Sequence, residues 1–362
     1  MRIAIVSGIA VTHDAISAAV AGEAEILQDI PTVESVAVFA QHVGRDLPCP
    51  SYEVQDPWAL MRHPVFESCD LAIFHWGIHY RMFDALTLLA AAGPTRAVVH
   101  FHNCTPQDLV AEADREIIGR SIGQIEHAIS LGVPFWTYSE FNRRTLLLWG
   151  ATESQISFVP IPIEIPPYSP SVRRSKYVRL LAVGRRVPAK GLHVLIEALG
   201  HVNRETRQAV RLRVAGSSRF SAPGYIDLLN DLLRRHRLVS MVTFVDEPTD
   251  AELWELYCTS DVVISPSFHE GLCVPIIEGY AVGCRAIGTT AGNLPFVVQS
   301  PDPCVEPGDP QALATAIERV VAEMENDTIR DRLHPELVEQ YSIGACRTLL
   351  QREIYRPASS VR

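Results

Sequence analysis

Lysine is scarce in this sequence of 362 residues, since Lys176 and Lys190 are the only two. Few side chains could therefore hold a cofactor aldehyde as an aldimine. The eight cysteines are scattered and form no C-x-x-C pair, which disfavours a disulfide framework or a zinc site. The sequence also has no Asp-x-Asp run placed for a cation and no G-x-G-x-x-G fingerprint at its first strand. We expect neither a metal nor a bound cofactor.

Long hydrophobic runs are absent as well. No apolar run approaches the length that crosses a bilayer. The opening residues 1–8 turn polar too soon for a secretory signal and are typical of a first strand. Hydrophobic residues make up 47% and charged residues 20% of the chain, which is a globular balance, and the length suits two domains. Together with the scattered cysteines, these features predict a cytoplasmic protein.

The net charge of −10 is distributed unevenly. Residues 1–163 hold nine basic and eighteen acidic side chains, whereas residues 164–362 are nearly balanced. An acidic first half disfavours nucleic acid and anionic membranes as partners, because both are themselves negatively charged. Solubility alone would also account for this charge.

In the first half, apolar runs alternate with helical patterns, which favours a parallel sheet with helices on both faces. Ligands of such sheets bind beyond the carboxyl ends of the strands. The expected strands are 2–7, 71–75, 97–101, 135–138 and 156–160, and the expected helices are 14–21, 33–42, 82–92, 109–131 and 140–149, the last capped by Ser139.

A proline-rich segment, residues 159–170, separates this half from a second one with the same rhythm, and we interpret it as a linker. The pattern predicts an α/β fold with domains at 1–163 and 164–342, and a last helix, residues 343–362, that crosses back to the first domain. In the second half we expect strands at 177–183, 210–215, 241–245 and 261–264, and helices from Leu192, from Thr249 or Asp250, and from Pro310 with Asp309 as its cap.

The turn after strand 177–183 carries two cations, Arg185 and Lys190, before a helix. A guanidinium fork and an ammonium at a strand-to-helix turn suit a pyrophosphate. A solvated basic loop is the alternative interpretation.

The stretch Ser265–Gly279 has the order strand, polar loop and helix, and it contains two glutamates, Glu270 and Glu278. The start of the helix, near Pro275, offers unpaired backbone N–H groups to a phosphate. The two carboxylates suit hydroxyl groups of a ribose or another sugar. Glu278, which we place in the first turn, could instead only offset the helix dipole.

These residues resemble the E-x7-E donor site of family-4 retaining glycosyltransferases with the GT-B fold. Three segments carry the resemblance: Glu270-Gly271-Leu272-Cys273-Val274-Pro275 with Glu278, the G-R-x4-K-G loop from Gly184 to Gly191, and His102-Asn103-Cys104-Thr105-Pro106. The resemblance implies two Rossmann-like doubly wound domains that face a cleft. It also implies a hexosyltransferase that needs no metal, because Arg185, Lys190 and the helix start neutralise the diphosphate.

The resemblance assigns roles to individual residues. His102 and Glu270 would be catalytic, near the transferred sugar, while Glu278 would hold the ribose and the backbone near Glu247 would contact the base. The remaining donor-binding residues would be Arg185, Lys190, Gly216, Gly271, Leu272 and Cys273. Acceptor binding would fall to the strand ends of the first domain, at Gly8, His75, Trp76 and His79, where Trp76 could stack on a sugar or simply belong to the core.

Cys273, Asp246 and Phe296 differ from the usual Gly, Gly and Glu of the family. Two other functions stay open: a nucleotide-sugar epimerase or phosphorylase on the same fold, which the scarcity of lysine disfavours, and a non-catalytic binding subunit, which the three differences would favour.

The acceptor is expected to be soluble and neutral or cationic, such as a sugar, an aminocyclitol or a small secondary metabolite. The first helical stretch, 13–23, has no Lys or Arg with which to contact anionic lipid. Arg143 and Arg144 precede Leu146-Leu147-Leu148-Trp149, and we expect the leucine side of that helix to face the core.

Overall fold

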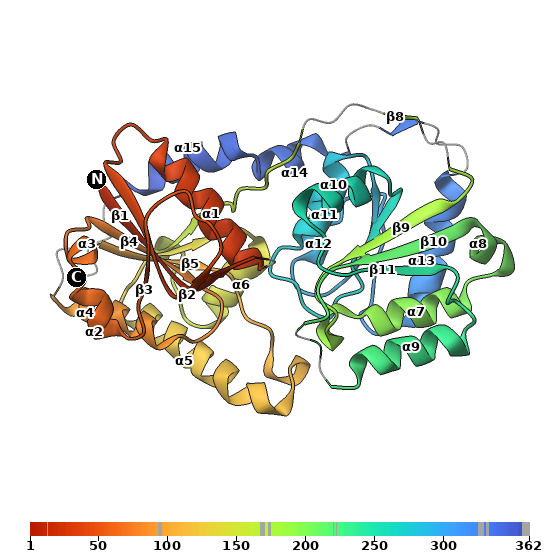
Figure 1. Cartoon of the computed structure of the whole chain (residues 1–362), viewed down its shortest axis with the longest axis horizontal. Coiled ribbons are helices and arrows are strands. Elements are labelled where there is room, and N and C mark those ends of the chain that lie inside the picture. The colour runs from red at the N-terminus through yellow and green to blue at the C-terminus, as the bar shows by residue number, and fades with distance from the viewer. Residues whose placement is uncertain are drawn as a thin grey trace. The chain divides into compact units, whose positions relative to one another are not determined.

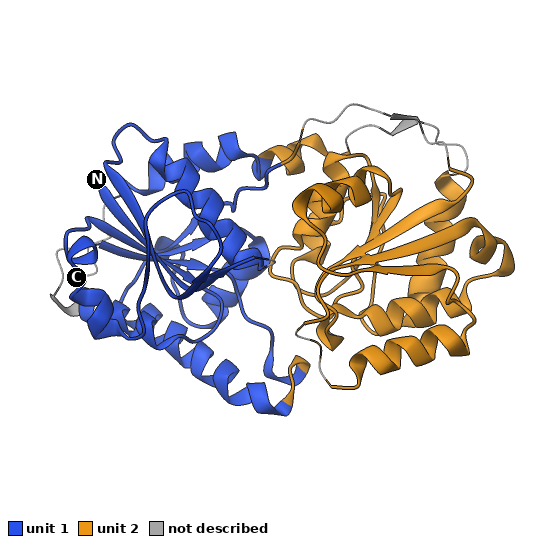
Figure 2. Ribbon diagram, viewed as in Figure 1, with its two compact units in different colours: residues 1–108, 112–164, 340–362 blue, residues 109–111, 165–339 orange. Residues whose placement is uncertain are grey.

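The computed structural model describes residues 1–12, 14–92, 96–166, 171–172, 175–219, 221, 223–324, 329–330 and 333–356 (Figure 1). The chain divides into two compact units (Figure 2). Unit 1 comprises Met1–Asp108, Glu112–Glu164 and Gln340–Arg362, and unit 2 comprises Leu109–Ala111 and Ile165–Glu339. Residues 167–170 of the expected linker and 357–362 of the expected last helix lie outside the described residues, as does residue 13.

Unit 1 is built on a parallel sheet of seven strands in the order β3-β2-β1-β4-β5-β6-β7. The strand order reverses between β1 and β4, and ligands of such sheets bind beyond the carboxyl ends of the strands near that point. The strands are β1 (Arg2–Val11), β2 (Ser35–Gly44), β3 (Ser51–Glu53), β4 (Leu71–Trp76), β5 (Arg96–Phe101), β6 (Phe135–Thr137) and β7 (Ile156–Phe158).

The sequence prediction was wrong about residues 33–42, which form strand β2 rather than a helix. Residues 36–40 are all buried, so the run is apolar all round and has no solvated helical face. It pairs with β1 in parallel register, from Arg2 opposite Ser35 to Val11 opposite Gly44. Continuous apolar runs are typical of parallel strands that are covered on both faces.

Helices cover this sheet, and one face is closed by α1 (Ala15–Gln28) together with α15 (Ile343–Glu353). The two helices pack on each other, and Leu350 and Ile354 of the C-terminal segment are fully buried in the same core as β1 and β4. The other helical segments of the unit are α2 (Pro57–Met61), α3 (Pro64–Glu67), η1 (Arg81–Asp84), α4 (Ala85–Ala92), η2 (Gln107–Leu109), η3 (Glu112–Asp114), α5 (Arg115–Ser130), α6 (Glu140–Leu148) and η4 (Glu153–Gln155).

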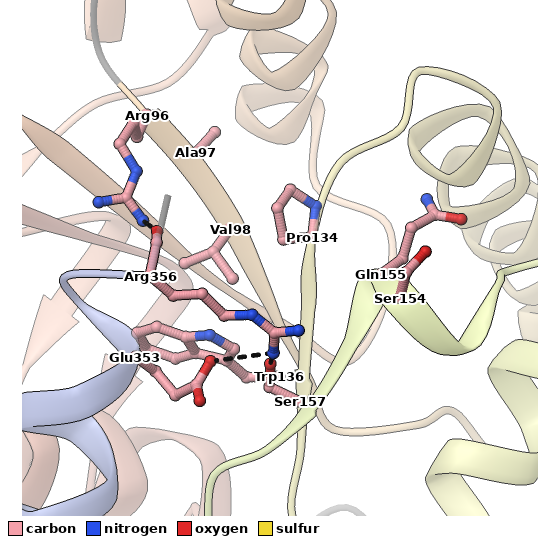
Figure 3. A pocket seen from close by; sticks show the side chains of 10 residues that line it. All are labelled: Arg96, Ala97, Val98, Pro134, Trp136, Ser154, Gln155, Ser157, Glu353 and Arg356. Carbon is pink, nitrogen blue, oxygen red and sulfur yellow. Dashed lines mark hydrogen bonds and ion pairs between the residues drawn. The ribbon is translucent and has the colours of Figure 1, made fainter. Parts of the chain in front are cut away.

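A small pocket lies where β5, β6 and β7 begin, beside the end of α15 (Figure 3). Arg96 donates to the carbonyl oxygen of Ile354 at 2.8 Å, and Arg356 bonds Ser157 and pairs with Glu353 at 3.4 Å. The pocket lies at the amino ends of the strands, so it is not at the edge where ligands of parallel sheets bind. Its polar groups fasten the C-terminal segment to the sheet.

Unit 2 repeats the architecture with a parallel sheet of six strands, in the order β11-β10-β9-β12-β13-β14. Its strands are β9 (Val178–Val183), β10 (Val210–Ala215), β11 (Val242–Val245), β12 (Val262–Ile264), β13 (Arg285–Thr289) and β14 (Cys304–Val305). A separate antiparallel pair joins β8 (Ser171–Val172) and β15 (Ile329–Arg330).

In unit 2 a shared hydrophobic core joins α7, α9 and α13 to the sheet, while α11 packs on β12 and β13. Several helix starts agree with the sequence prediction, because Thr249 forms a capping box with Glu252 and Asp309 caps the helix that opens with Pro310. The helices are η5 (Pro188–Lys190), α7 (Leu192–His201), α8 (Arg204–Ala209), α9 (Tyr225–Arg235), α10 (Asp250–Cys258), α11 (Val274–Ala281), α12 (Leu294–Val297), α13 (Pro310–Glu323) and α14 (Pro335–Gln340).

Among the described residues, no helix combines the length and the apolar character that crossing a membrane requires.

Candidate active site

Two loops meet at the carboxyl edge of the second sheet, one after β9 and the other after β12. The backbone N–H of Phe268 donates to the carbonyl oxygen of Ala189 at 2.8 Å, and this bond joins the loops directly. The N–H of Asn293 donates to the carbonyl oxygen of Glu270 at 2.8 Å and fixes the second loop from its other side. Strands β9 and β12 are neighbours at the point where the strand order reverses, which is the usual ligand site of such a sheet.

Lys190 and Glu270, two of the charged residues predicted at the donor site, contact each other. Lys190 Nζ lies 2.8 Å from Glu270 Oε1, and the two side chains are 27% and 11% exposed. Ser267 Oγ donates to the same carboxylate oxygen at 2.7 Å. The structure thus brings these residues together, and each of the two charges has a partner.

Two glycines allow the backbone to pack closely around this pair. A Cβ on Gly191 would lie 2.0 Å from the carbonyl oxygen of Pro266, and one on Gly216 would lie 2.2 Å from that of Gly184. Both glycines also have positive φ angles, 66° and 137°. Any other residue at these positions would push the loops apart.

Cys273 adopts the left-handed conformation, with φ 72° and ψ 64°, directly before α11. A side chain in this region is strained, whereas glycine is not. The residue is buried, and burial raises the pKa of its thiol. The backbone therefore has the conformation that suits glycine, although the residue is cysteine. Its neighbour Leu272 is also buried, and Gly271 is half-buried.

The sequence prediction placed Glu278 in the first turn of its helix, and this prediction is wrong. Helix α11 begins at Val274 and has no acidic residue in its first turn. The helix dipole is therefore a weaker reason for this glutamate than the sequence had indicated. Burial, with a smaller contribution from Asp250, raises the pKa of Glu278 to about 7, although a hydrogen bond with Tyr257 acts in the opposite direction.

Arg185 is exposed, whereas its neighbour Arg186, which the sequence interpretation overlooked, is buried. The guanidinium of Arg186 lies 4.8 Å from the ring centre of Phe244, and its Nη2 lies 3.4 Å from Asp246. A run of two arginines gives no sequence signal that separates the buried one from the exposed one.

Asp246 and Glu247 each accept hydrogen bonds from the loop after β10. Asp246 accepts from the N–H and the hydroxyl of Ser218 at 3.0 and 2.8 Å, and these bonds lower the pKa of its carboxyl. Glu247, in the left-handed conformation with φ 46°, accepts from Ser217 at 2.7 Å. Both acidic residues thus hold a neighbouring loop.

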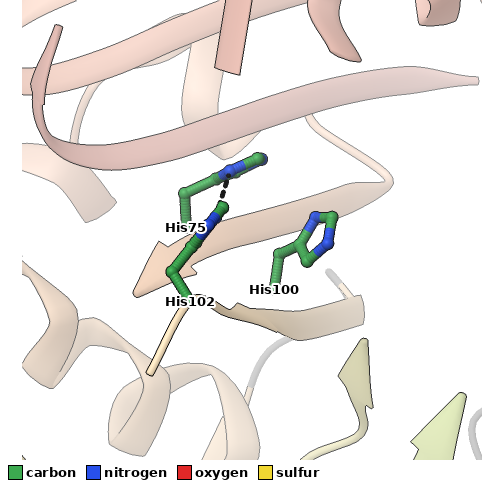
Figure 4. Close-up of side chains that lie close together, drawn as sticks. All are labelled: His75, His100 and His102. Carbon is green, nitrogen blue, oxygen red and sulfur yellow. Dashed lines mark hydrogen bonds between the residues drawn. The ribbon is translucent and has the colours of Figure 1, made fainter. Parts of the chain in front are cut away.

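In unit 1, His102 directly follows β5 at the carboxyl edge of the sheet. Its ring lies beside those of His75 and His100 (Figure 4), and the ligating atoms of the three rings lie within 4.8 Å of one another. His75 Nδ1 is 2.9 Å from His102 Nε2, and His100 Nδ1 is 2.9 Å from the buried carboxylate of Glu23. The sequence interpretation did not anticipate this cluster of three imidazoles and a carboxylate.

The predicted acceptor residues are only partly accessible. Trp76 is fully buried, stacks on Phe101 with ring centres 5.2 Å apart and donates to Gln124, so no face is open to a sugar and the core interpretation is correct. His75 is also buried, so it offers no surface to an acceptor. Gly8 leaves room for the ring of Tyr80, because a Cβ on residue 8 would lie 1.9 Å from that ring.

His79 is half-buried, and its backbone N–H donates to Ser121 at 2.8 Å. It is therefore the one residue of the predicted acceptor set whose side chain is both sizeable and partly exposed.

The basic edge of α6 differs from our expectation. Leu146 is fully buried, as predicted, but Leu148 is 86% exposed. Arg143 is neutralised by Glu140 at 2.8 Å and by Glu153 at 2.5 Å, and Arg144 also pairs with Glu140.

Residues 169–333 match the family model of glycosyl transferases group 1. Curated relatives include D-inositol 3-phosphate glycosyltransferases of Kineococcus radiotolerans, 28% identical over 51% of this chain and 46% of that protein, and of Nocardia farcinica, 27% identical over 52% and 45%. The chain therefore spans less than half the length of these curated relatives.

Solved structures match nearly the whole chain. Anabaena HepE in complex with UDP and glucose aligns with a TM-score of 0.73 and 16% identity over 98% of this chain and 99% of that one. Sucrose-phosphate synthase from Thermosynechococcus elongatus aligns with a TM-score of 0.76 and 18% identity, over 98% of both chains. The chain has the GT-B fold. The predicted fold class of two Rossmann-like domains is thereby confirmed.

We predict that Cys273→Gly is more stable than Cys273→Ala by about 1 kcal/mol, because both remove the buried sulfur but only glycine relieves the left-handed strain. Urea denaturation of the two variants measures the difference. Cys284, which is buried and lies outside the positive-φ positions, is the control: there the alanine variant should be the more stable. An alanine variant as stable as the glycine variant at position 273 would contradict the strain.

Proposed function

We propose that this protein is a retaining, metal-independent glycosyltransferase that moves a sugar from a nucleotide-diphosphate sugar to a hydroxyl of a soluble acceptor in the cytoplasm. The observation that supports it most directly is the contact between Lys190 and Glu270 at the carboxyl edge of the second sheet, within the segment that matches the family model. A cation and a carboxylate side by side suit the two parts of such a donor, its diphosphate and its sugar hydroxyls.

Donor binding would exchange partners within this pair. The diphosphate would take the place of the Glu270 carboxylate beside the Lys190 ammonium. The freed carboxylate could then accept hydrogen bonds from sugar hydroxyls. Exposed Arg185 and the first N–H groups of α11 would supply further positive charge, so a divalent cation would not be needed to neutralise the diphosphate.

In the transfer step, Glu270 and His102 would lie near the transferred sugar. A carboxylate there stabilises the positive charge that develops at the anomeric carbon. The relatives support the donor class: the HepE structure holds UDP and glucose, and the curated relatives are glycosyltransferases that act on inositol 3-phosphate by name.

A panel of nucleotide sugars, each incubated with the protein and candidate acceptors, tests the proposal. We expect release of nucleoside diphosphate and a glycosylated product with unchanged anomeric configuration, by NMR, and equal rates with and without EDTA. Binding without turnover of any donor would favour the non-catalytic subunit, and epimerised or phosphorolysed sugar would favour the other enzymes.

We predict that Lys190→Ala weakens binding of nucleoside diphosphate by about ten- to a hundredfold. A hydrogen bond to a charged group contributes roughly 1.5–3 kcal/mol, and losing that free energy lowers the affinity by this factor. Calorimetry measures it. Lys176→Ala, which changes the only other lysine, should bind normally. Glu270→Gln should retain diphosphate affinity but lose affinity for the complete donor. Equal affinity of Lys190→Ala and the unmodified protein would contradict the assignment of the diphosphate.

We predict that nucleotide affinity rises with pH through about 7, because the Glu278 carboxylate forms there and accepts hydrogen bonds from ribose better than the neutral acid does. The ratio of the affinities of the unmodified protein and Glu278→Gln, measured between about pH 6 and 8, cancels the ionisation of the phosphate. A ratio that does not vary with pH would contradict the ribose role.

Folding raises the pKa of Glu278. The free energy of unfolding should therefore fall as the pH rises from the pKa of this carboxyl in the unfolded chain toward 7.

For the acceptor, we predict that the protein does not sediment with anionic vesicles at low salt. The arginines of α6 are paired with glutamates, and the exposed Leu148 alone buries too little apolar area for stable anchoring. Co-sedimentation that Arg143→Glu abolishes would overturn the soluble acceptor, and Leu148→Ser separates an apolar contribution from a charged one.

A further inference from the structure

Unit 1 buries a carboxylate and three imidazoles together, a set of polar groups that the core tolerates only if they satisfy one another. Glu23 lies on α1, His75 on β4, and His100 and His102 on and just after β5. Glu23, His75 and His100 are at most 1% exposed, whereas His102 is 8% exposed. The cluster therefore runs from the interior to a side chain at the carboxyl edge of the sheet.

The hydrogen bonds of His100 are fixed by its two partners, both of which can only accept. Its Nδ1 lies 2.9 Å from Glu23 Oε2, and its Nε2 lies 3.2 Å from the carbonyl oxygen of Val159. Both nitrogens must therefore donate, and the ring balances the charge of the carboxylate. Burial alone would raise the pKa of Glu23, but its contacts with His75 and His100 outweigh burial and lower that pKa to about 2.

His75 lies between the carboxylate and His102. Its Nε2 is 3.4 Å from Glu23 Oε2 and has no hydrogen-bond partner among the described residues. A lone pair facing a carboxylate would be repelled, so the proton of a neutral ring belongs on Nε2. Its Nδ1 then carries the lone pair and accepts from His102 Nε2, 2.9 Å away.

We infer that Glu23 and His75 are positioning residues that hold His102 as its Nε2–H tautomer, so that His102 Nδ1 offers a lone pair and accepts a hydrogen bond from a hydroxyl of the bound sugar. This inference rests on the proposed function for the identity of the ligand, but the tautomer itself does not. Burial lowers the pKa of His75 and, together with the neighbouring rings, lowers that of His102 well below its ordinary value, in keeping with neutral rings.

The same three imidazoles are close enough to suggest a metal site. Their hydrogen bonds instead favour the series Glu23–His75–His102, which we call the relay. Both nitrogens of His100 face acceptors, and His75 faces Glu23 on one side and His102 on the other. A cation would have to displace these partners and turn the rings toward a common centre. The rings of His75 and His102 instead have planes inclined by only 27° and share the 2.9 Å hydrogen bond, so the two nitrogens that a cation would need already face each other.

Long-range ¹H–¹⁵N correlation spectra of protein labelled with ¹⁵N-histidine test the tautomer without any substrate. We expect His102, assigned by the peak lost in His102→Ala, to carry its proton on Nε2. A proton on Nδ1, or a shift of these peaks with stoichiometric Zn²⁺, would overturn the relay.

Glu23→Gln tests the dependence on the carboxylate. An amide can donate to His75 Nε2 and reverse every bond of the chain, so we expect the Nδ1–H form of His102 to appear. The rate of sugar transfer, kcat, should fall about ten- to a hundredfold, as for other residues that orient a ligating side chain, with donor KM nearly unchanged. Glu53→Gln, which alters an exposed glutamate 3.0 Å from His42, should change neither.

If Glu23→Gln does not fold, His75→Gln removes the ring that accepts from His102, and the spectrum of the unmodified protein already decides the tautomer. Unchanged kcat in a folded Glu23→Gln would overturn the positioning role while the proposed function stands. The predicted tautomer in a protein that transfers no sugar would overturn the proposed function and leave the hydrogen-bonded relay supported.

Discussion

The ion pair between Lys190 and Glu270 is the interaction on which the proposed donor site depends. It joins the loop after β9 to the loop after β12, beside the backbone bond from Phe268 to Ala189. A partly buried charge that loses its partner costs several times more than an exposed pair contributes. The two loops therefore stay together while no ligand is bound, and a ligand must offer each charge a substitute. A nucleotide-diphosphate sugar carries both substitutes in one molecule.

The carboxylate of Glu23 differs from the Lys190–Glu270 pair because neither water nor a ligand can reach it. The Lys190 and Glu270 side chains retain 27% and 11% exposure, so water and ligands can reach the pair. Glu23 and His100 are 1% and 0% exposed, so exchanging their partners would leave a charge in the core. The first pair can open for a ligand, and the second can only orient what lies beside it. This difference in exposure agrees with the proposed donor site in unit 2 and with a fixed histidine in unit 1.

The fold could be predicted largely from the sequence, because apolar runs, caps and the proline-rich segment are local signals. Residues 33–42 were misassigned because a strand that is buried on both faces has the same composition as a buried helix. Lys190 and Glu270 were singled out because each follows a predicted strand, and the structure places the two side chains in contact. The glutamate–histidine cluster could not be predicted, because α1, β4 and β5 bring its members together only in the folded sheet. Arg186 is buried whereas Arg185 is exposed, and Trp76 is buried rather than at the surface. The residue type alone does not predict either result, because burial is set by the tertiary structure.

The three positions that differ from the resembled family are compatible with the backbone of the site. The Asp246 side chain accepts a hydrogen bond from the N–H of Ser218 and so holds the loop after β10. Glycine, which has no side chain, could not make this bond. Cys273 keeps the left-handed conformation of glycine at some cost in strain. Phe296, in α12, is 37% exposed and adds an aromatic side chain where an acid is usual. None of the three breaks the bond from Asn293 to Glu270 or the ion pair with Lys190. The differences therefore leave the loops in place and change only the side chains that a ligand would meet, so under the proposed function they bear on which donor binds more than on whether one can bind.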